Sequence, residues 1–188
     1  MVWVIGASGL CGVGKTLATR YFEKIWGFER VYFGQAVLDE VASRGLPPTP
    51  ENEKKVRLAM RAELGPAFLV IRSAEDIKKI ADSGRNITID AIYTMDEYDH
   101  LCLLLPGTPI ALLAIRASFQ TRCARLVARP ERPLQIADIR SRDETEKKEL
   151  DIQRVMTGAA KRIINNGTLE EFKKKLDIFW RETKNPRR

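Results

Sequence analysis

Short runs of β-branched and aliphatic residues alternate along the chain with longer segments in which apolar residues recur every three or four positions. The short runs predict five strands, over residues 2–5, 30–33, 86–90, 109–115 and 162–165. The run over 109–115 is the most apolar, which favours the centre of a sheet. Strands that alternate with helices form parallel sheets. We therefore expect a three-layer α/β fold, with a five-stranded parallel sheet and helices on both faces.

The longer segments predict helices, and several of them carry end signals. We expect helices over residues 15–26, 36–44, 50–64, 67–82, 96–105, 119–127 and 138–155, with a last one from 169 onward. Thr49 is a suitable N-cap for a helix whose first residue is Pro50. Ser118 is a second cap, and Thr168 with Glu171 has the spacing of a capping box.

The length of the chain indicates a single domain, because 188 residues are enough to bury a core of their own. The helices over about 36–82 stand between two strands and are too short for a separate domain. We interpret them as an acceptor-side insertion that walls a second substrate pocket. Simple cover of the sheet is the alternative.

A glycine-rich run lies between the first predicted strand and the first predicted helix. It reads Gly9-Leu10-Cys11-Gly12-Val13-Gly14-Lys15-Thr16, which has the spacing of a phosphate-binding loop. The glycines let successive backbone N–H groups point at an anion, and the helix N-terminus adds its positive end. We expect Lys15 to reach the β- and γ-phosphates and the Thr16 hydroxyl to bind Mg²⁺. All eight residues are therefore candidates for binding ATP or GTP, and the alternative is a merely structural turn.

Asp90 ends the predicted strand over 86–90. A phosphate-binding loop needs an acid near its metal ion, commonly at the end of a neighbouring strand. There the acid holds a Mg²⁺-bound water or accepts a proton from the attacking hydroxyl. Asp90 is thus a candidate for both metal binding and catalysis, the alternative being an ordinary carboxylate at a strand end.

Seven arginines and no lysine lie between residues 116 and 142. Guanidinium groups neutralise the charge of phosphoryl transfer with a bidentate geometry that lysine lacks. We assign catalytic roles to Arg129, Arg132 and Arg142. Two prolines interrupt this segment and predict a mobile lid over about 129–145 that closes over the nucleotide. A solvated helix face is the alternative for some of these arginines, Arg122 above all.

Composition says less than the motifs do about which molecules the protein binds. The net charge of +7 indicates an anionic partner, without choosing among nucleotide, nucleic acid and membrane surface. Cys11, Cys102 and Cys123 are an odd and widely spaced set, which predicts reduced thiols. No apolar run approaches a membrane span, and no leader is evident, so we expect a cytoplasmic protein without a membrane partner.

Five further segments carry a resemblance to a known family. They are Phe33-Gly34-Gln35, residues 44–52, Ile89-Asp90-Ala91-Ile92, Arg142-Asp143 and residues 166–172. In this order, and together with the glycine-rich loop, they span most of the chain. The chain thereby resembles the nucleoside-monophosphate-kinase-like branch of P-loop kinases, nearest the adenylate-kinase-related, dephospho-CoA-kinase-like proteins found mainly in archaea. The resemblance implies an ATP-dependent kinase with an arginine-bearing lid and an adenine contact near Asn165 and Gly167.

Two positions depart from the pattern of that family. The related proteins usually have an acid where this chain has Gln35, and Asp-Gly where it has Asp90-Ala91. An amide cannot accept a proton as a carboxylate can, so either Asp90 alone serves as base or the acceptor differs.

Three functions follow from these residues. The first is a kinase acting on a nucleoside monophosphate or a dephospho-CoA-like acceptor. The alternatives are a nucleic-acid kinase, favoured by the net charge, and a regulatory NTPase without a small acceptor, favoured by Gln35. The sequence does not choose the acceptor, the oligomeric state, or ATP over GTP.

Overall fold

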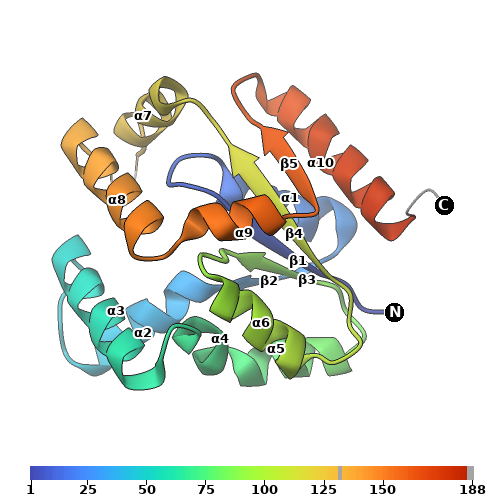
Figure 1. Cartoon of the computed structure of the whole chain (residues 1–188), viewed down its shortest axis with the longest axis horizontal. Helices are drawn as coiled ribbons and strands as arrows, with labels where there is room; N and C mark the ends of the chain where they lie inside the picture. The colour runs from blue at the N-terminus through green and yellow to red at the C-terminus, as the bar shows by residue number, and fades with distance from the viewer. Residues whose placement is uncertain (131–132, 186–188) are drawn as a thin grey trace.

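The computed structural model describes residues 1–130 and 133–185. Its strands are β1 (Val4–Ser8), β2 (Glu29–Tyr32), β3 (Ile87–Asp90), β4 (Ile110–Arg116) and β5 (Lys161–Ile164). They form one parallel sheet in the order β2-β3-β1-β4-β5 (Figure 1). The predicted α/β fold with a five-stranded parallel sheet is confirmed. The central strand is β1, and the most apolar strand, β4, lies next to it; both are interior strands with helices packed on both faces, so both are apolar.

Ten helices cover this sheet within the described residues. They are α1 (Lys15–Trp26), α2 (Phe33–Ser43), α3 (Pro50–Leu64), α4 (Phe68–Arg72), α5 (Ala74–Asp82), α6 (Met95–Leu104), α7 (Phe119–Val127), α8 (Ile136–Lys148), α9 (Ile152–Gly158) and α10 (Leu169–Lys184). The predicted caps are confirmed, since the side chains of Thr49, Ser118 and Thr168 each accept a hydrogen bond from the backbone N–H three residues on.

Two predicted helices are each broken into a pair. The helix expected over 67–82 is interrupted at Ser73, between α4 and α5. The helix expected over 138–155 is interrupted between α8 and α9, where Asp151 has a φ of 47° and so takes the left-handed conformation. Apolar residues repeat with a helical period on both sides of each break, which is why periodicity alone predicts one continuous helix.

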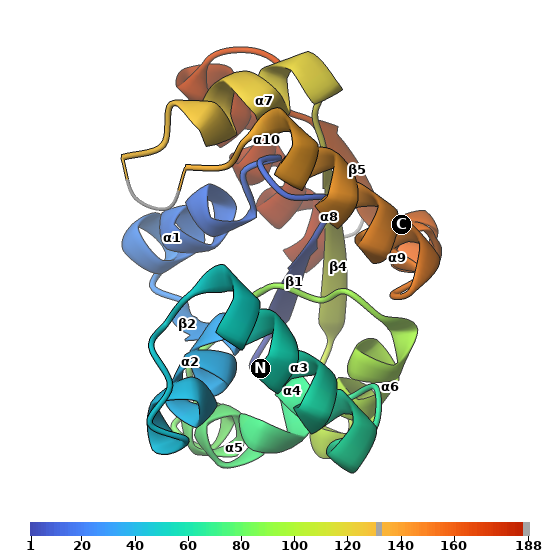
Figure 2. The same ribbon diagram turned by 90° about the vertical axis from the view of Figure 1, so that its left-hand side faces the viewer.

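The side chains of the strands alternate between two cores. On one face, Ile5, Leu113 and Ile163 pack with residues of α1 and α10 such as Phe22 and Phe172. The opposite face carries Val4, Ile87, Ile89 and Leu112 against the helices from α2 to α6 and against α9. One face is thus covered by α1 and α10, and the other by α2 to α6 together with α9. In Figure 2, α2 to α6 fill the lower half of the molecule and α7 to α10 the upper half. The sheet therefore lies between helices on both faces, as expected.

The carboxyl ends of all five strands meet at one edge, because every pair is parallel. The glycine-rich loop leaves this edge from β1, and Asp90 ends β3 there, paired with Ala7 of β1. Asn165 follows β5 at the same edge. Ligands of open α/β sheets bind outside this edge, so the fold brings the predicted site residues together.

Two expectations drawn from composition can be compared with the described residues. In residues 1–130 and 133–185 no helix has the length and apolarity needed to cross a membrane. All three cysteines are free, in agreement with the prediction of reduced thiols.

Candidate active site

The glycine-rich loop is a backbone structure that side chains would disrupt. Gly9, Gly12 and Gly14 have φ angles of 141°, 80° and 105°, which L side chains rarely adopt. A Cβ at Gly14 would also lie 2.7 Å from Nδ2 of Asn165. The loop then turns directly into α1, whose first residue is Lys15. The sequence places the loop correctly, and the structure adds the reason for its glycines.

Lys15 is folded back over the loop that precedes it. Its Nζ donates hydrogen bonds to the carbonyl oxygens of Gly9, at 2.6 Å, and Leu10, at 3.2 Å. The ammonium group also lies over the ring of Tyr93, 5.2 Å from the ring centroid. Only 8% of Lys15 is exposed, so the cation is held inside the site.

The electrostatic surroundings keep Lys15 charged. Burial by itself lowers the pKa of Lys15, but the neighbouring groups Tyr93, Glu146 and Asp90 oppose it, and the net effect is a raised pKa. A permanently cationic lysine is what a polyphosphate site requires.

Asp90 lies at the end of β3 with 4% of its surface exposed. Its Oδ2 is 3.7 Å from Nη1 of Arg30, which is too long for a hydrogen bond, and it has no hydrogen-bond partner among the described residues. The carboxylate is thus close to cations yet has acceptor capacity to spare. Thr16, the other predicted metal ligand, is exposed in the first turn of α1.

Arg30 is a site residue that sequence reasoning missed. It lies in β2, approaches Asp90, and leaves its Nε buried without a hydrogen-bond partner in the described chain. The sequence did hold one signal, a charged residue inside a short predicted strand. Arginine is rarely buried without an ionic partner, so such a residue indicates an acid nearby.

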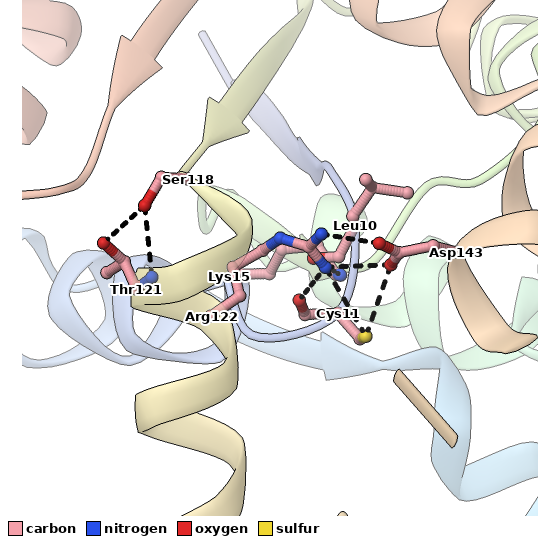
Figure 3. A network of polar contacts seen from close by, with 7 residues as sticks. All are labelled: Leu10, Cys11, Lys15, Ser118, Thr121, Arg122 and Asp143. Carbon is pink, nitrogen blue, oxygen red and sulfur yellow. Dashed lines mark hydrogen bonds and ion pairs between the residues drawn. The ribbon is translucent and has the colours of Figure 1, made fainter. Parts of the chain in front are cut away.

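Arg122 forms a buried ion pair beside the glycine-rich loop (Figure 3). Its Nη1 and Nη2 donate to the two carboxylate oxygens of Asp143 in α8, at 2.8 and 2.5 Å. The same Nη1 donates to the carbonyl oxygen of Cys11 at 3.1 Å. The interpretation of Arg122 as part of a solvated face is therefore wrong: it is 3% exposed and ties the loop to α7 and α8.

Glu146 is a second site residue that sequence reasoning missed. It lies one helical turn beyond Asp143 on α8, and only 5% of it is exposed. Burial raises the pKa of Glu146, and the nearby charges of Lys15 and Arg142 oppose that rise.

The three predicted catalytic arginines differ in where they lie relative to the glycine-rich loop. Arg129 is exposed just after α7. Arg142 is exposed on α8, although its charge acts on Glu146 and Tyr93. Arg132 lies outside the described residues. The structure thus places Arg142 near the loop. It also places Arg122 there, a residue that its sequence spacing did not mark as part of the site.

Asn165 lies against the loop. Its Nδ2 donates to the carbonyl oxygen of Val13 at 2.8 Å, and its Oδ1 accepts from Arg125 at 3.4 Å. With 4% of its surface exposed, the side chain fixes the shape of the loop from the end of β5. Gly167 is exposed in the turn before α10.

Glu97 supports the segment that carries Tyr93. It is fully buried in α6, and its carboxylate accepts hydrogen bonds from the backbone N–H groups of Tyr93, at 2.7 Å, and Thr94, at 3.3 Å. Burial raises its pKa to about 7. A buried carboxylate thereby holds the backbone of the tyrosine that covers Lys15.

Gln35 lies in the first turn of α2, at the start of the predicted acceptor side. The side chain is exposed and donates a hydrogen bond from Nε2 to Oδ1 of Asp39 at 2.8 Å. The amide is therefore accessible, and its contact to Asp39 is local.

Several solved structures that share the fold are named as kinases. The Thermus thermophilus protein TT1252 matches with a TM-score of 0.67 at 14% identity, over 96% of this chain and 97% of that one. A gluconokinase from Sinorhizobium meliloti matches with a TM-score of 0.57 at 15% identity, over 98% and 94%. A shikimate kinase from Acinetobacter baumannii, in complex with shikimate, has a TM-score of 0.53 at 12% identity, over 98% and 96%. The chain thus has the fold of these kinases, with a glycine-rich loop between β1 and α1.

Curated relatives identify the family. A UPF0200 protein of Pyrococcus abyssi is 30% identical over 183 residues, which cover 95% of this chain and 96% of that protein. A UPF0200 protein of Aeropyrum pernix is 27% identical over 169 residues, covering 90% and 87%. The chain belongs to the UPF0200 family. No protein-family model matches it.

Proposed function

We propose that the protein is an ATP- or GTP-dependent kinase that transfers the γ-phosphate to a small nucleotide-like acceptor. The observation that carries this proposal is that the cationic Lys15 and the buried Asp90 lie at the same carboxyl edge of the sheet, where the charge of Asp90 acts on Lys15. A phosphate cradle and an acid with spare acceptor capacity are the two parts that phosphoryl transfer needs.

The residues of the loop fit a nucleoside triphosphate with Mg²⁺. Residues 9–16 would hold the phosphates through backbone N–H groups and Lys15, and Thr16 with Asp90 would hold the metal ion. The described residues contain no cluster of three or more His, Cys, Asp or Glu side chains that could hold a metal ion by themselves. That fits Mg²⁺, which is usually held by one or two protein ligands together with phosphate oxygens and water. When bound, the ion would neutralise charge that develops on the phosphate oxygens.

Asp90 is the proposed base on the acceptor side. Its Oδ2 lacks a hydrogen-bond partner within the described chain and would accept the proton of the attacking group where that group is a hydroxyl, as in a dephospho-CoA-like acceptor. A nucleoside monophosphate would attack through a phosphate oxygen and would need no such base. Since position 35 is an amide in this chain, Asp90 would act alone. Arg129, Arg132 and Arg142, in a lid over about 129–145, would stabilise the charge of the transferred group.

The acceptor class rests on the family resemblance and on fold neighbours. A nucleoside monophosphate or a dephospho-CoA-like molecule is the acceptor we propose, seated against the insertion over about 36–82. Gluconokinase and shikimate kinase, which share the fold, are named for small acceptors. This favours a small molecule over a nucleic acid.

An acceptor panel tests the proposal. Purified protein with labelled ATP or GTP and Mg²⁺ is incubated with nucleoside monophosphates, dephospho-CoA, gluconate, shikimate and an oligonucleotide, and products are separated by thin-layer chromatography. We expect one small nucleotide to be phosphorylated, and Asp90→Asn to slow that transfer by orders of magnitude while nucleotide still binds. Slow hydrolysis without transfer to any acceptor would contradict the proposal.

A regulatory NTPase is the second candidate. The exposed amide of Gln35, in place of the usual acid, favours it. The same panel separates the two functions, because such a protein would bind and slowly hydrolyse nucleotide but phosphorylate no acceptor.

A further inference from the structure

One carbonyl oxygen of the glycine-rich loop is held by a side chain from another helix. Nη1 of Arg122, in α7, donates a hydrogen bond to the carbonyl oxygen of Cys11 at 3.1 Å (Figure 3). A planar trans peptide points its C=O and the following N–H in opposite directions. The N–H of Gly12 therefore faces away from Arg122. A loop of this kind binds an anion through backbone N–H groups that share one direction, so Arg122 fixes the direction of one such donor.

The guanidinium group of Arg122 is itself fixed by two neighbours. Its Nη1 and Nη2 donate to the two carboxylate oxygens of Asp143 at 2.8 and 2.5 Å. Its Cζ lies 5.4 Å from the centroid of the Phe119 ring. Nη1 carries two hydrogens, so it can bind Asp143 and the Cys11 carbonyl together. Asp143 thus sets the position of Nη1, and Nη1 holds the carbonyl of Cys11.

The packing of α7 and α8 leaves this part of the loop little room to move. A Cβ at Gly12 would lie 2.8 Å from Cδ1 of Leu126 and 3.2 Å from Cβ of Arg122. Cys11 packs in one buried cluster with Leu126 and with Ile139 of α8. The Cys11–Gly12 peptide therefore lies directly against the two helices that Arg122 and Asp143 join.

A second peptide of the loop is held in the same way from a different element. Nδ2 of Asn165, after β5, donates to the carbonyl oxygen of Val13 at 2.8 Å. By the same geometry of the trans peptide, the N–H of Gly14 faces away from Asn165. Two alternate loop carbonyls are thus bound by side chains from distant parts of the sequence.

We propose that Arg122 is a positioning residue for phosphate binding: its hydrogen bond to the Cys11 carbonyl holds the N–H of Gly12 toward a bound polyphosphate, and Asp143 holds Arg122 in place. The inference rests on the proposed binding of a nucleoside triphosphate by the loop, but it does not require transfer to an acceptor. Arg122 acts through the loop and does not itself contact the ligand.

A double substitution separates this role from a purely structural one. Replacing both partners of a buried ion pair by apolar side chains is often neutral or stabilising, whereas removing one partner is not. Arg122→Met combined with Asp143→Leu keeps the net charge and should be as stable as the wild type in urea denaturation. Calorimetric titration should nevertheless show roughly tenfold weaker binding of inorganic tripolyphosphate, and of ADP with Mg²⁺, because the loop peptide is no longer held.

A surface ion pair provides the matched control. Nζ of Lys161 lies 2.6 Å from Oε2 of Glu182, and the two side chains are 44% and 49% exposed. Lys161→Met combined with Glu182→Leu removes the same two charges and should bind both probes like the wild type. Wild-type affinity in a stably folded variant with Arg122→Met and Asp143→Leu would overturn the inference.

A second measurement uses the wild-type sequence. In NMR spectra of ¹⁵N-labelled protein, tripolyphosphate should shift the amide proton of Gly12 more than that of Gly27, whose N–H donates to the Phe22 carbonyl at the other end of α1. An unmoved Gly12 signal would overturn the inference even if the double variant failed to fold. Weaker binding by the double variant, with no transfer to any acceptor by the wild type, would support the inference and refute the kinase proposal. If the wild type binds neither probe, both are wrong.

Discussion

The glycine-rich loop and the Asp90 side of the same sheet edge differ in how their charges are paired. Around the loop, ionic groups are joined at hydrogen-bond distance: Lys15 to the Gly9 carbonyl at 2.6 Å, and Arg122 to Asp143 at 2.5 and 2.8 Å. At Asp90 the nearest cationic side chain with an ion-pair distance, Arg30, is 3.7 Å away. The loop is therefore preorganised by contacts within the chain, whereas Asp90 keeps unused acceptor capacity.

This difference between the loop and Asp90 predicts which hydrogen bonds each would lose or gain when a ligand binds. If the loop binds phosphate as proposed, it would exchange internal hydrogen bonds for bonds to phosphate oxygens, so its affinity would depend on the bonds it loses. Asp90 can accept a new hydrogen bond without losing one. Four substitutions test this contrast, and they follow from the largest expected effect to the smallest.

Arg122→Ala breaks the tightest pair and should lower the free energy of unfolding by about 3–5 kcal/mol, because it leaves the buried Asp143 carboxylate without its partner. Urea denaturation followed by circular dichroism measures the loss. Arg129→Ala, which removes an exposed arginine, is the control and should change stability little. A loss below about 1 kcal/mol for Arg122→Ala would mean that the pair is as weak as a surface salt bridge.

Lys15→Ala removes the cation of the loop. We expect turnover to fall by about 10²- to 10³-fold, equivalent to about 3–4 kcal/mol, with weaker nucleotide binding. The assay is phosphoryl transfer or hydrolysis together with calorimetric nucleotide titration. Lys24→Ala, exposed in the last turn of the same helix, should behave like the wild type. Full activity of Lys15→Ala would refute the donor role of the loop.

Glu97→Gln tests how the buried carboxylate that binds the backbone of Tyr93 changes the stability of the protein with pH. Because burial raises the pKa of Glu97 from 4.5 to about 7, the folded state binds its proton more tightly than the unfolded state. Wild-type stability from this group is thus fully present below pH 4.5 and is lost as pH rises through 7. The variant keeps a carbonyl oxygen for the N–H groups of Tyr93 and Thr94 but does not titrate.

The difference in unfolding free energy between Glu97→Gln and wild type should therefore shift in favour of the variant by about 3 kcal/mol between pH 4.5 and pH 8. Urea denaturation at several pH values measures it, and other titrating groups cancel in the difference. Parallel pH profiles for the two proteins would show that Glu97 does not titrate in this range.

Arg30→Gln should have the smallest effect on folding, about 1 kcal/mol or less, because Lys15 still faces Asp90 with positive charge. The same denaturation experiment compares it directly with Arg122→Ala. A loss as large as that of Arg122→Ala would erase the contrast between the two regions and show that Asp90 depends on Arg30.

Most of the fold was predictable because its signals are local. The capping residues Thr49 and Thr168, and the glycines of the loop, act on backbone groups only a few positions away. The position of Asp90 was predictable for a similar reason, since a strand that ends in an acid can be recognised from a short stretch of sequence. The breaks at Ser73 and Asp151 were missed because apolar periodicity continues across them.

The polar network of the site was not predictable in the same way. Glu146 is buried and Glu144 is exposed, yet the two acids lie two residues apart in one charge-dense helix whose sequence does not separate them. Arg122 likewise has the spacing of a solvated face, but it pairs with Asp143 21 positions away and contacts Cys11 111 positions away. Such pairs depend on how helices dock.

The sequence by itself thus determined a parallel α/β fold, the loop over residues 9–16 and the acid that ends β3, because periodicity, glycine conformation and strand ends are properties of short segments. Only the tertiary structure decided that α8 lies against the loop, that Arg122 is buried against Asp143, and that Glu146 is buried. The physical reason is that the burial and pairing of a charge depend on which distant surface covers it. No local pattern encodes that surface.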